Sequence, residues 1–177
     1  MVLALAAPDL PQFAGKGMGA RALLYPLAAV LVPVVWWTRG RRPPYPHGID
    51  ALVVLPFVVD MAGNALALFD RVDHFDEVAH LLNWALLVAA FGLAVSRTGI
   101  GRLNAWALAV GFGATTHLLW ELAEYVVMTL GFYGLDLTYT DTIGDLAVSF
   151  LGTLLGAVVT LVAPRRARVG PRSGLSR

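Results

Sequence analysis

Carboxylates and imidazoles gather in one short stretch of the chain, residues 70–83, which reads DRVDHFDEVAHLLN. If the stretch is a helix, four of its side chains share about a quarter of the helix circumference. These are Asp70, Asp73, Glu77 and His80. His74 lies at the margin of the same face, so the stretch predicts a stripe of oxygen and nitrogen ligands suited to a cation. Long apolar runs flank it, which places the stripe at the start of an apolar helix.

Three further sets of polar side chains lie inside the apolar runs, each at helical spacing. The sets are Asp60 with Asn64, His117 with Glu121 and Glu124, and Asp141 with Asp145 and Ser149. Spacings of three and four residues put the members of a set on one helix face. An ionisable group near the centre of a bilayer costs at least about 2.5–3.5 kcal/mol, so we expect these faces to meet inside a bundle. With no Lys or Arg expected at their depth, the acids require protonation, a bound cation or water.

The composition favours a membrane protein. Of the 177 residues, 58% are hydrophobic and 14% are charged, whereas a soluble domain has about 25% charged residues. The chain has no cysteine, which excludes disulfides, zinc–thiolate sites and thiol nucleophiles. We therefore expect the lipid bilayer, and no nucleic acid, as the main partner of the chain.

The apolar runs predict an all-α fold, a polytopic transmembrane helix bundle with about five spans. The expected spans are residues 21–38, 49–69, 76–96, 103–130 and 141–163. They form one transmembrane domain, residues 1–163, since the length leaves no room for a second unit. Residues 164–177 contain five arginines among Gly, Pro and Ser, which predicts a basic, disordered cytoplasmic tail.

The positions of the arginines predict the orientation of the bundle. Basic residues follow the first, third and fifth spans, and these three segments lie on one side of the membrane. The residues are Arg39, Arg41 and Arg42, then Arg97 and Arg102, then the tail. Because basic loops stay in the cytoplasm, the N-terminus is expected outside and the C-terminus inside. The polar sets then fall in the outer half of a bacterial-type inner membrane, which the chain crosses several times.

Each set also has an ordinary structural interpretation. Acids at the start of a helix suit the helix dipole whether or not they bind anything, which applies to Asp70, Asp73 and Asp76. Asp141 is interpreted in the same way as a helix N-cap, and His117 as a hydrogen-bonded core histidine. A GxxxG step, Gly152 to Gly156, continues the face of Asp145, and we interpret it as close helix packing inside the bundle.

Three motifs resemble the VanZ-like membrane proteins and the related YjdF-type inner-membrane family. They are DRVDHFDEVAHLL, HLLWELAEY and TYTDTIGDLAVSFLGTLLGA. The matching positions are Asp70, Asp73, His74 and Phe75; Trp120, Glu121 and Glu124; and Asp141, Asp145, Gly152, Gly156 and Ala157. The chain departs from the VanZ-like pattern at Ser149, where that helix usually carries Asn. The resemblance implies a helical membrane fold and this polar site; the VanZ name itself implies glycopeptide resistance, without a defined reaction.

Two functions from different classes fit these observations. The first is a cell-envelope protein with an outward-facing acidic and histidine pocket that binds a cation or the polar headgroup of an amphiphile. The second is a membrane-embedded, metal-dependent hydrolase acting on a lipid or lipid-linked substrate, because Glu77-x-x-His80 resembles the Glu-x-x-His step of di-metal bundles. Glu121 and Glu77 are then the catalytic candidates, with a divalent metal ion held among the acids and histidines. A proton or cation path is a third, weaker interpretation.

Overall fold

A computed structural model describes residues 2–41, 44–131 and 138–163. In this part of the chain all regular structure is helical, which confirms the all-α prediction. The helices are α1 (Val2–Ala6), α2 (Met18–Thr38), α3 (His47–Ala65), α4 (Leu68–Arg71), α5 (Phe75–Ser96), α6 (Arg102–Thr129), α7 (Tyr139–Ala157) and α8 (Val159–Val162). The predicted tail, residues 164–177, lies outside the described residues.

Four segments are long and apolar enough to cross a membrane. They are Met18–Thr38, His47–Ala65, Phe75–Ser96 and Tyr139–Val162, the last combining α7 and α8. Their bounds agree closely with four of the expected spans. The fifth expected span, residues 103–130, corresponds to α6, which is the longest helix but is not among the four. Polar residues such as Asn104, Thr116 and His117 lower its mean hydropathy, so a five-span bundle stays a prediction.

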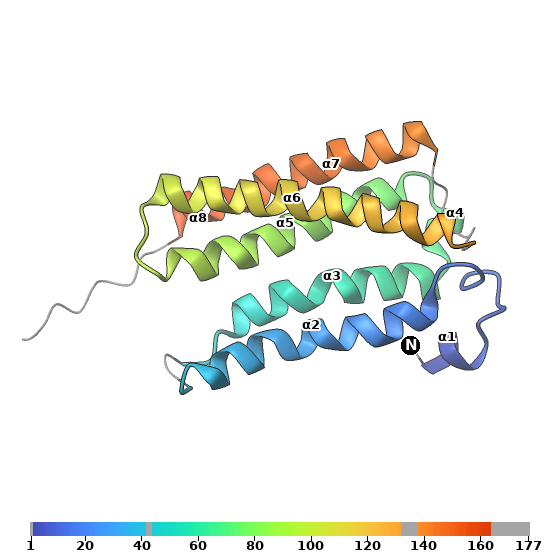
Figure 1. The fold of residues 1–177 in the computed structure, drawn as a ribbon, viewed down its shortest axis with the longest axis horizontal. Helices are drawn as coiled ribbons and strands as arrows, with labels where there is room; N and C mark the ends of the chain where they lie inside the picture. Colours follow the sequence, from blue (N-terminus) through green and yellow to red (C-terminus); the bar gives the residue numbers. More distant parts are fainter. Residues whose placement is uncertain (1, 42–43, 132–137, 164–177) are drawn as a thin grey trace, which may run out of the picture.

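The helices form two layers, with α2 and α3 in one and α5, α6 and α7 in the other (Figure 1). Helix α5 is central because it packs against α3, α6 and α7. One end of the bundle, which we call the polar end, collects the start of α2, the end of α3, α4, the start of α5, the end of α6 and the start of α7. This connectivity brings the polar sets of the sequence to the same end of the bundle.

Helices α5 and α7 approach most closely through the GxxxG step. A Cβ atom added at Gly152 would collide with the backbone carbonyl oxygen of Leu81, and one at Gly156 with that of Ala85. Only a residue without a side chain lets the two backbones come this near. The predicted packing role of the motif is therefore confirmed, and it fixes Asp145, about two turns before Gly152, against the start of α5.

The stretch 70–83 is not one helix, contrary to the sequence prediction. Helix α4 ends at Arg71, Val72 is extended, and His74 has a left-handed backbone with φ of 62° before α5 begins at Phe75. This break lets Phe75 pack edge-to-face on Phe69, with ring centroids 4.9 Å apart. As a result, Asp70 and Asp73 leave the helix face that carries His80.

Candidate functional site

A cavity of about 270 Å³ lies at the polar end, between the layer of α2 and α3 and the layer of α5 and α6. Its wall comes from the segment before α2 and from all four of these helices. The side chains include two cations, several carboxylates, one histidine and five aromatic rings. The wall of this cavity is therefore mixed in charge rather than purely acidic, and the predicted binding pocket stays a prediction.

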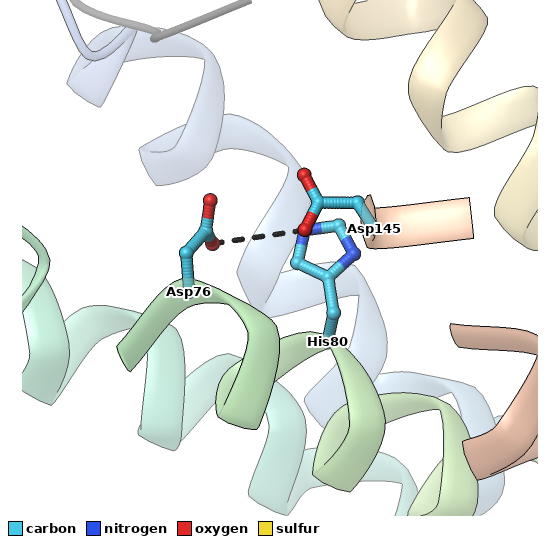
Figure 2. A group of neighbouring side chains, drawn as sticks. All are labelled: Asp76, His80 and Asp145. Carbon is cyan, nitrogen blue, oxygen red and sulfur yellow. Dashed lines mark ion pairs between the residues drawn. The ribbon is translucent and has the colours of Figure 1, made fainter. Parts of the chain in front are cut away.

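Beside this cavity, and partly lining it, lies a group of ionisable side chains that we call the buried cluster. Its members are Asp76, His80, Glu121, Glu124 and Asp145. The Asp76 side chain is 47% exposed at the edge of the cluster, whereas those of His80 and Glu121 are 10% and 4% exposed. One ligand atom each from Asp76, His80 and Asp145 lies within 4.8 Å of the others (Figure 2), and the same holds for His80, Glu121 and Glu124. His80 thus belongs to both groups of three, and three helices supply the members.

His80 holds the centre of the buried cluster through both ring nitrogens. Its Nδ1 lies 3.0 Å from Ser149 Oγ and 3.7 Å from Glu121 Oε1. Its Nε2 lies 3.7 Å from Asp76 Oδ1, one turn earlier on the same helix. The imidazole is only 10% exposed. A ring held by a hydroxyl group on one nitrogen can present the other to a metal ion, which is how second-shell groups orient histidine ligands.

Glu121 is the least satisfied member of the buried cluster. Its side chain is 4% exposed, and neither carboxylate oxygen has a hydrogen-bond partner among the described residues. Buried polar groups are nearly always hydrogen-bonded, and a buried charge needs a counter-charge or a metal ion. The nearest basic atom is His80 Nδ1, at a distance too long for a hydrogen bond. The carboxylate therefore lies in a position where a cation or a proton is required.

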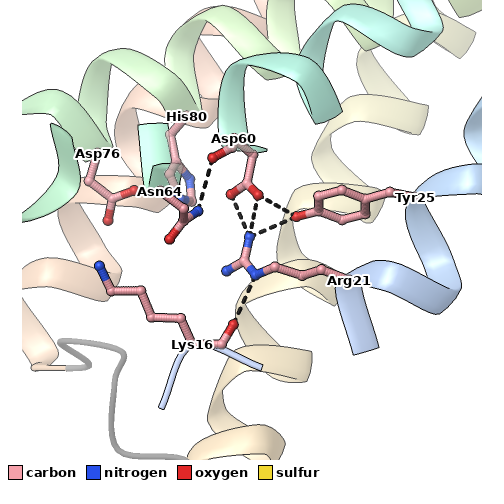
Figure 3. A network of polar contacts seen from close by, with 7 residues as sticks. All are labelled: Lys16, Arg21, Tyr25, Asp60, Asn64, Asp76 and His80. Atoms are coloured by element: carbon pink, nitrogen blue, oxygen red, sulfur yellow. Dashed lines mark hydrogen bonds and ion pairs between the residues drawn. The ribbon is translucent and has the colours of Figure 1, made fainter. Parts of the chain in front are cut away.

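Opposite the buried cluster, Arg21 forms a network that the sequence interpretation missed (Figure 3). Its Nη1 donates to both carboxylate oxygens of Asp60 at 2.5 Å and to Tyr25 Oη at 2.7 Å. The Tyr25 hydroxyl in turn donates to Asp60 at 2.6 Å. Lys16 pairs with Asp70 at 2.7 Å. The expectation that no Lys or Arg reaches these acids is wrong, because α2 begins at Met18 and places both cations beside the cavity.

Several predicted ligands lie near the surface instead. Glu77 pairs with His74 at 3.0 Å, and their side chains are 41% and 82% exposed. The hydrogen bond that the His74 ring donates to Glu77 raises the pKa of His74, which lies outside the spanning helices. Asp73 and Asp141 line a second pocket of about 210 Å³ together with Glu77. The Glu77-x-x-His80 ligand step is therefore not formed, and Asp76 takes its place one turn before His80.

Three other predicted positions, His117, Asn64 and Asp141, lie outside both metal-capable groups. His117 is buried near the rings of Trp84 and Phe150, with centroids 5.9 and 6.3 Å away, and it does not join either metal-capable group. Its Nδ1 has no hydrogen-bond partner among the described residues, contrary to the interpretation as a hydrogen-bonded core histidine. Asn64 is buried and donates to the backbone carbonyl of Asp60 at 2.9 Å. The N-cap of α7 is Thr138, whose hydroxyl accepts from the backbone N–H of Asp141, so Asp141 lies in the first turn rather than at the cap.

Comparison with known families agrees with this picture. Residues 16–166 match the family described as "Predicted membrane protein (DUF2238)". The chain belongs to this family. No curated protein and no solved structure matches the chain. The family and the four apolar helices together identify an integral membrane protein, whereas the VanZ-like and YjdF-type names are not part of the match.

Proposed function

We propose that this membrane protein binds a divalent cation in its buried cluster and holds the polar headgroup of an amphiphile in the adjoining cavity. The observation that carries the proposal is Glu121, a buried carboxylate with no hydrogen-bond partner among the described residues. A cation among the five ligands would supply the missing counter-charge. Carboxylate oxygen and imidazole nitrogen together suit zinc and similar divalent ions.

The buried cluster offers more than one arrangement for such an ion. Asp76 and Asp145 form one group of three with His80, and Glu121 and Glu124 form the other; Asp76 lies on the Nε2 side of the ring and Glu121 on the Nδ1 side. Repulsion among four carboxylates within one site is unfavourable unless a cation or protons offset it. The bundle has already brought these groups together from α5, α6 and α7, so an ion would be bound without reorganising the fold.

A metal-dependent hydrolase remains the second candidate, and one feature favours it. His80 and Glu124 belong to the buried cluster and also line the cavity, so a bound metal would face the space that a substrate occupies. Such a metal lowers the pKa of its bound water and creates a nucleophile without Ser or Cys. A carboxylate of the buried cluster, Glu121 for example, then serves as the base.

The placement in the membrane belongs to the same proposal. Helix α6 lies within the bundle against α5 and α7 and, at about 1.5 Å of rise per residue, is long enough to be the fifth span. With five spans the arginine-rich segments share the cytoplasmic side, and the polar end faces outward from a bacterial-type inner membrane. The resemblance of the motifs to VanZ-like proteins fits an envelope role at that face.

Glu121→Gln, compared with Glu77→Gln, tests the cation site. Titration of chelator-stripped protein in mild detergent with Zn²⁺ or Mn²⁺ should show binding to wild type and to Glu77→Gln, and at least about tenfold weaker binding to Glu121→Gln. The stripped Glu121→Gln protein should melt at or above the wild-type temperature, because the substitution removes a buried charge. Equal binding by all three proteins would rule out the buried cluster as the ion site.

A further inference from the structure

The cavity changes from charged to apolar along its length. Each of the four helices that line it carries charged residues nearer the polar end and apolar or aromatic residues deeper in the bundle. The pairs are Arg21 then Tyr25, Asp60 then Phe57, Asp76 then Leu87, and Glu124 then Trp120. Such a gradient matches a molecule with a charged head and a hydrocarbon body, and does not match a small ion or sugar alone.

The cavity also reaches the side of the bundle. Helices α2 and α6 both line it, yet α2 packs on α3 while α6 packs on α5 and α7, without extensive contact between α2 and α6. Trp120 of α6 lines the cavity and is still 37% exposed. A volume of about 270 Å³ holds a headgroup rather than a whole lipid. The hydrocarbon chains of a lipid bound in the cavity would therefore pass out between α2 and α6 and remain in the bilayer.

The polar half of the cavity carries charges of both signs (Figure 3). Lys16 and Arg21 come from the segment before α2 and from α2, and they pair with Asp70 and Asp60, which also line the cavity. Asp76 and Glu124 come from α5 and α6. Arg21 donates hydrogen bonds through Nε and Nη1, and none among the described residues uses Nη2. Arg21 therefore has a donor for a phosphate, and Asp76 and Glu124 have carboxylates for an ammonium group.

We propose that the cavity binds a phospholipid with a zwitterionic phosphoethanolamine headgroup. The phosphate lies against Arg21 and Lys16, the primary ammonium against Asp76 and Glu124, and the first part of the chains against Phe57 and Trp84. The proposal deepens the headgroup part of the proposed function and rests on that part alone, because no bound metal is required.

Native mass spectrometry of delipidated protein in mild detergent, with chelator present, tests this assignment. The probes are dioleoylphosphatidylethanolamine, dioleoylphosphatidic acid, dioleoylphosphatidylglycerol, dioleoylglycerol and soluble phosphoethanolamine. We expect retention of the phosphatidylethanolamine at least about tenfold above that of each other probe, since each lacks the ammonium, the phosphate or the chains. Equal retention of phosphatidylethanolamine and phosphatidylglycerol would overturn the zwitterion assignment.

Two variants test the phosphate-binding and the ammonium-binding residues one at a time. Arg21→Gln combined with Asp60→Asn removes both charges of the ion pair, so it does not strand either partner, and should reduce phosphatidylethanolamine retention about tenfold. Asp76→Asn should reduce it similarly while leaving phosphatidic acid retention unchanged. Arg71→Gln, at an exposed basic residue of the same end, is the matched control and should bind like wild type. Wild-type retention by the double variant would overturn the placement of the phosphate.

The outcomes also distinguish this inference from the proposed function. Binding of every phospholipid without preference leaves a headgroup site standing and rejects the zwitterionic ligand. Retention of none of the lipids rejects both the zwitterionic ligand and the headgroup part of the proposed function, whereas the cation site is tested separately by the metal titration. Loss of Zn²⁺ binding in Glu121→Gln with unchanged lipid retention supports two separate binding events in one region of the protein.

Discussion

Two histidine–glutamate pairs lie near the polar end of the bundle and have very different surroundings. His74 and Glu77 are 3.0 Å apart, with side chains 82% and 41% exposed. His80 and Glu121 are 3.7 Å apart, with side chains 10% and 4% exposed. The exposed pair is neighbouring in sequence and forms a hydrogen bond, whereas the buried pair joins α5 to α6 and does not.

This difference shows why residue type alone does not identify a site. Water solvates the polar atoms of the exposed pair that lack a protein partner, so the pair contributes little to stability and needs no ligand. The buried pair has little access to water, and its carboxylate has no hydrogen-bond partner among the described residues. The same two residue types are therefore an ordinary surface contact in one place and a candidate ligand site in the other.

Labelling of single cysteines gives the largest expected effect, since it is all or none. The chain has no cysteine of its own, so Tyr139→Cys and Thr98→Cys each provide one specific target. Tyr139, at the polar end, is 84% exposed, and Thr98 is exposed in the loop before α6 at the opposite end. A membrane-impermeant maleimide should label Tyr139→Cys on intact cells and Thr98→Cys only after permeabilisation. The reverse result would place the polar end, with both histidine–glutamate pairs, on the cytoplasmic side.

His80→Ala should have the next largest effect, with His74→Ala as its control. His80 belongs to both groups that could hold an ion, so its loss should remove the stabilisation by Zn²⁺. An ion at about a hundred times its Kd stabilises a folded protein by about 2.7 kcal/mol. Melting of each variant with Zn²⁺ and with chelator measures that difference, and any loss of the Ser149 contact cancels between the two conditions. A Zn²⁺ response that persists in His80→Ala would contradict the buried cluster as the ion site.

The sequence was sufficient for the helices and for the end of the bundle where the polar residues gather. Hydropathy predicts the four apolar spans because transfer to lipid depends on each side chain nearly independently of the fold. The GxxxG step likewise predicts close packing, because small size is a property of the residue itself. Positions inside apolar runs select Glu121, Glu124, His80 and Asp145 as candidates, and the structure brings these side chains close together, but ion binding by them stays a prediction.

The membership of the buried cluster could not be predicted in full, for physical reasons. The left-handed backbone at His74 interrupts the helix, and residue types near it do not require that break, since positive φ is uncommon outside glycine. The break takes Asp70 and Asp73 off the helix face of His80. Asp76 and Glu77 both stay on α5 with His80, and of these two it is Asp76 that joins His80 in a group that could hold an ion. Arg21 was missed because a long side chain reaches well beyond its own turn, so its position in sequence understates its contact with Asp60.

The smallest expected effect is the titration of His74, which tests whether the exposed pair behaves as an independent surface contact. The hydrogen bond and charge of Glu77 raise the pKa of His74 above its ordinary value, whereas slight burial opposes the shift. A raised pKa in the folded protein means that the contact stabilises fully below about pH 6.5 and that this stabilisation is lost as the pH rises through the raised pKa. Glu77→Gln should return the pKa of His74 to its ordinary value, and Glu121→Gln should leave it unchanged, as read from the His74 ring proton by NMR. If Glu121→Gln also moves the His74 titration, the exposed pair and the buried cluster are electrostatically coupled, and they cannot be treated as two separate regions.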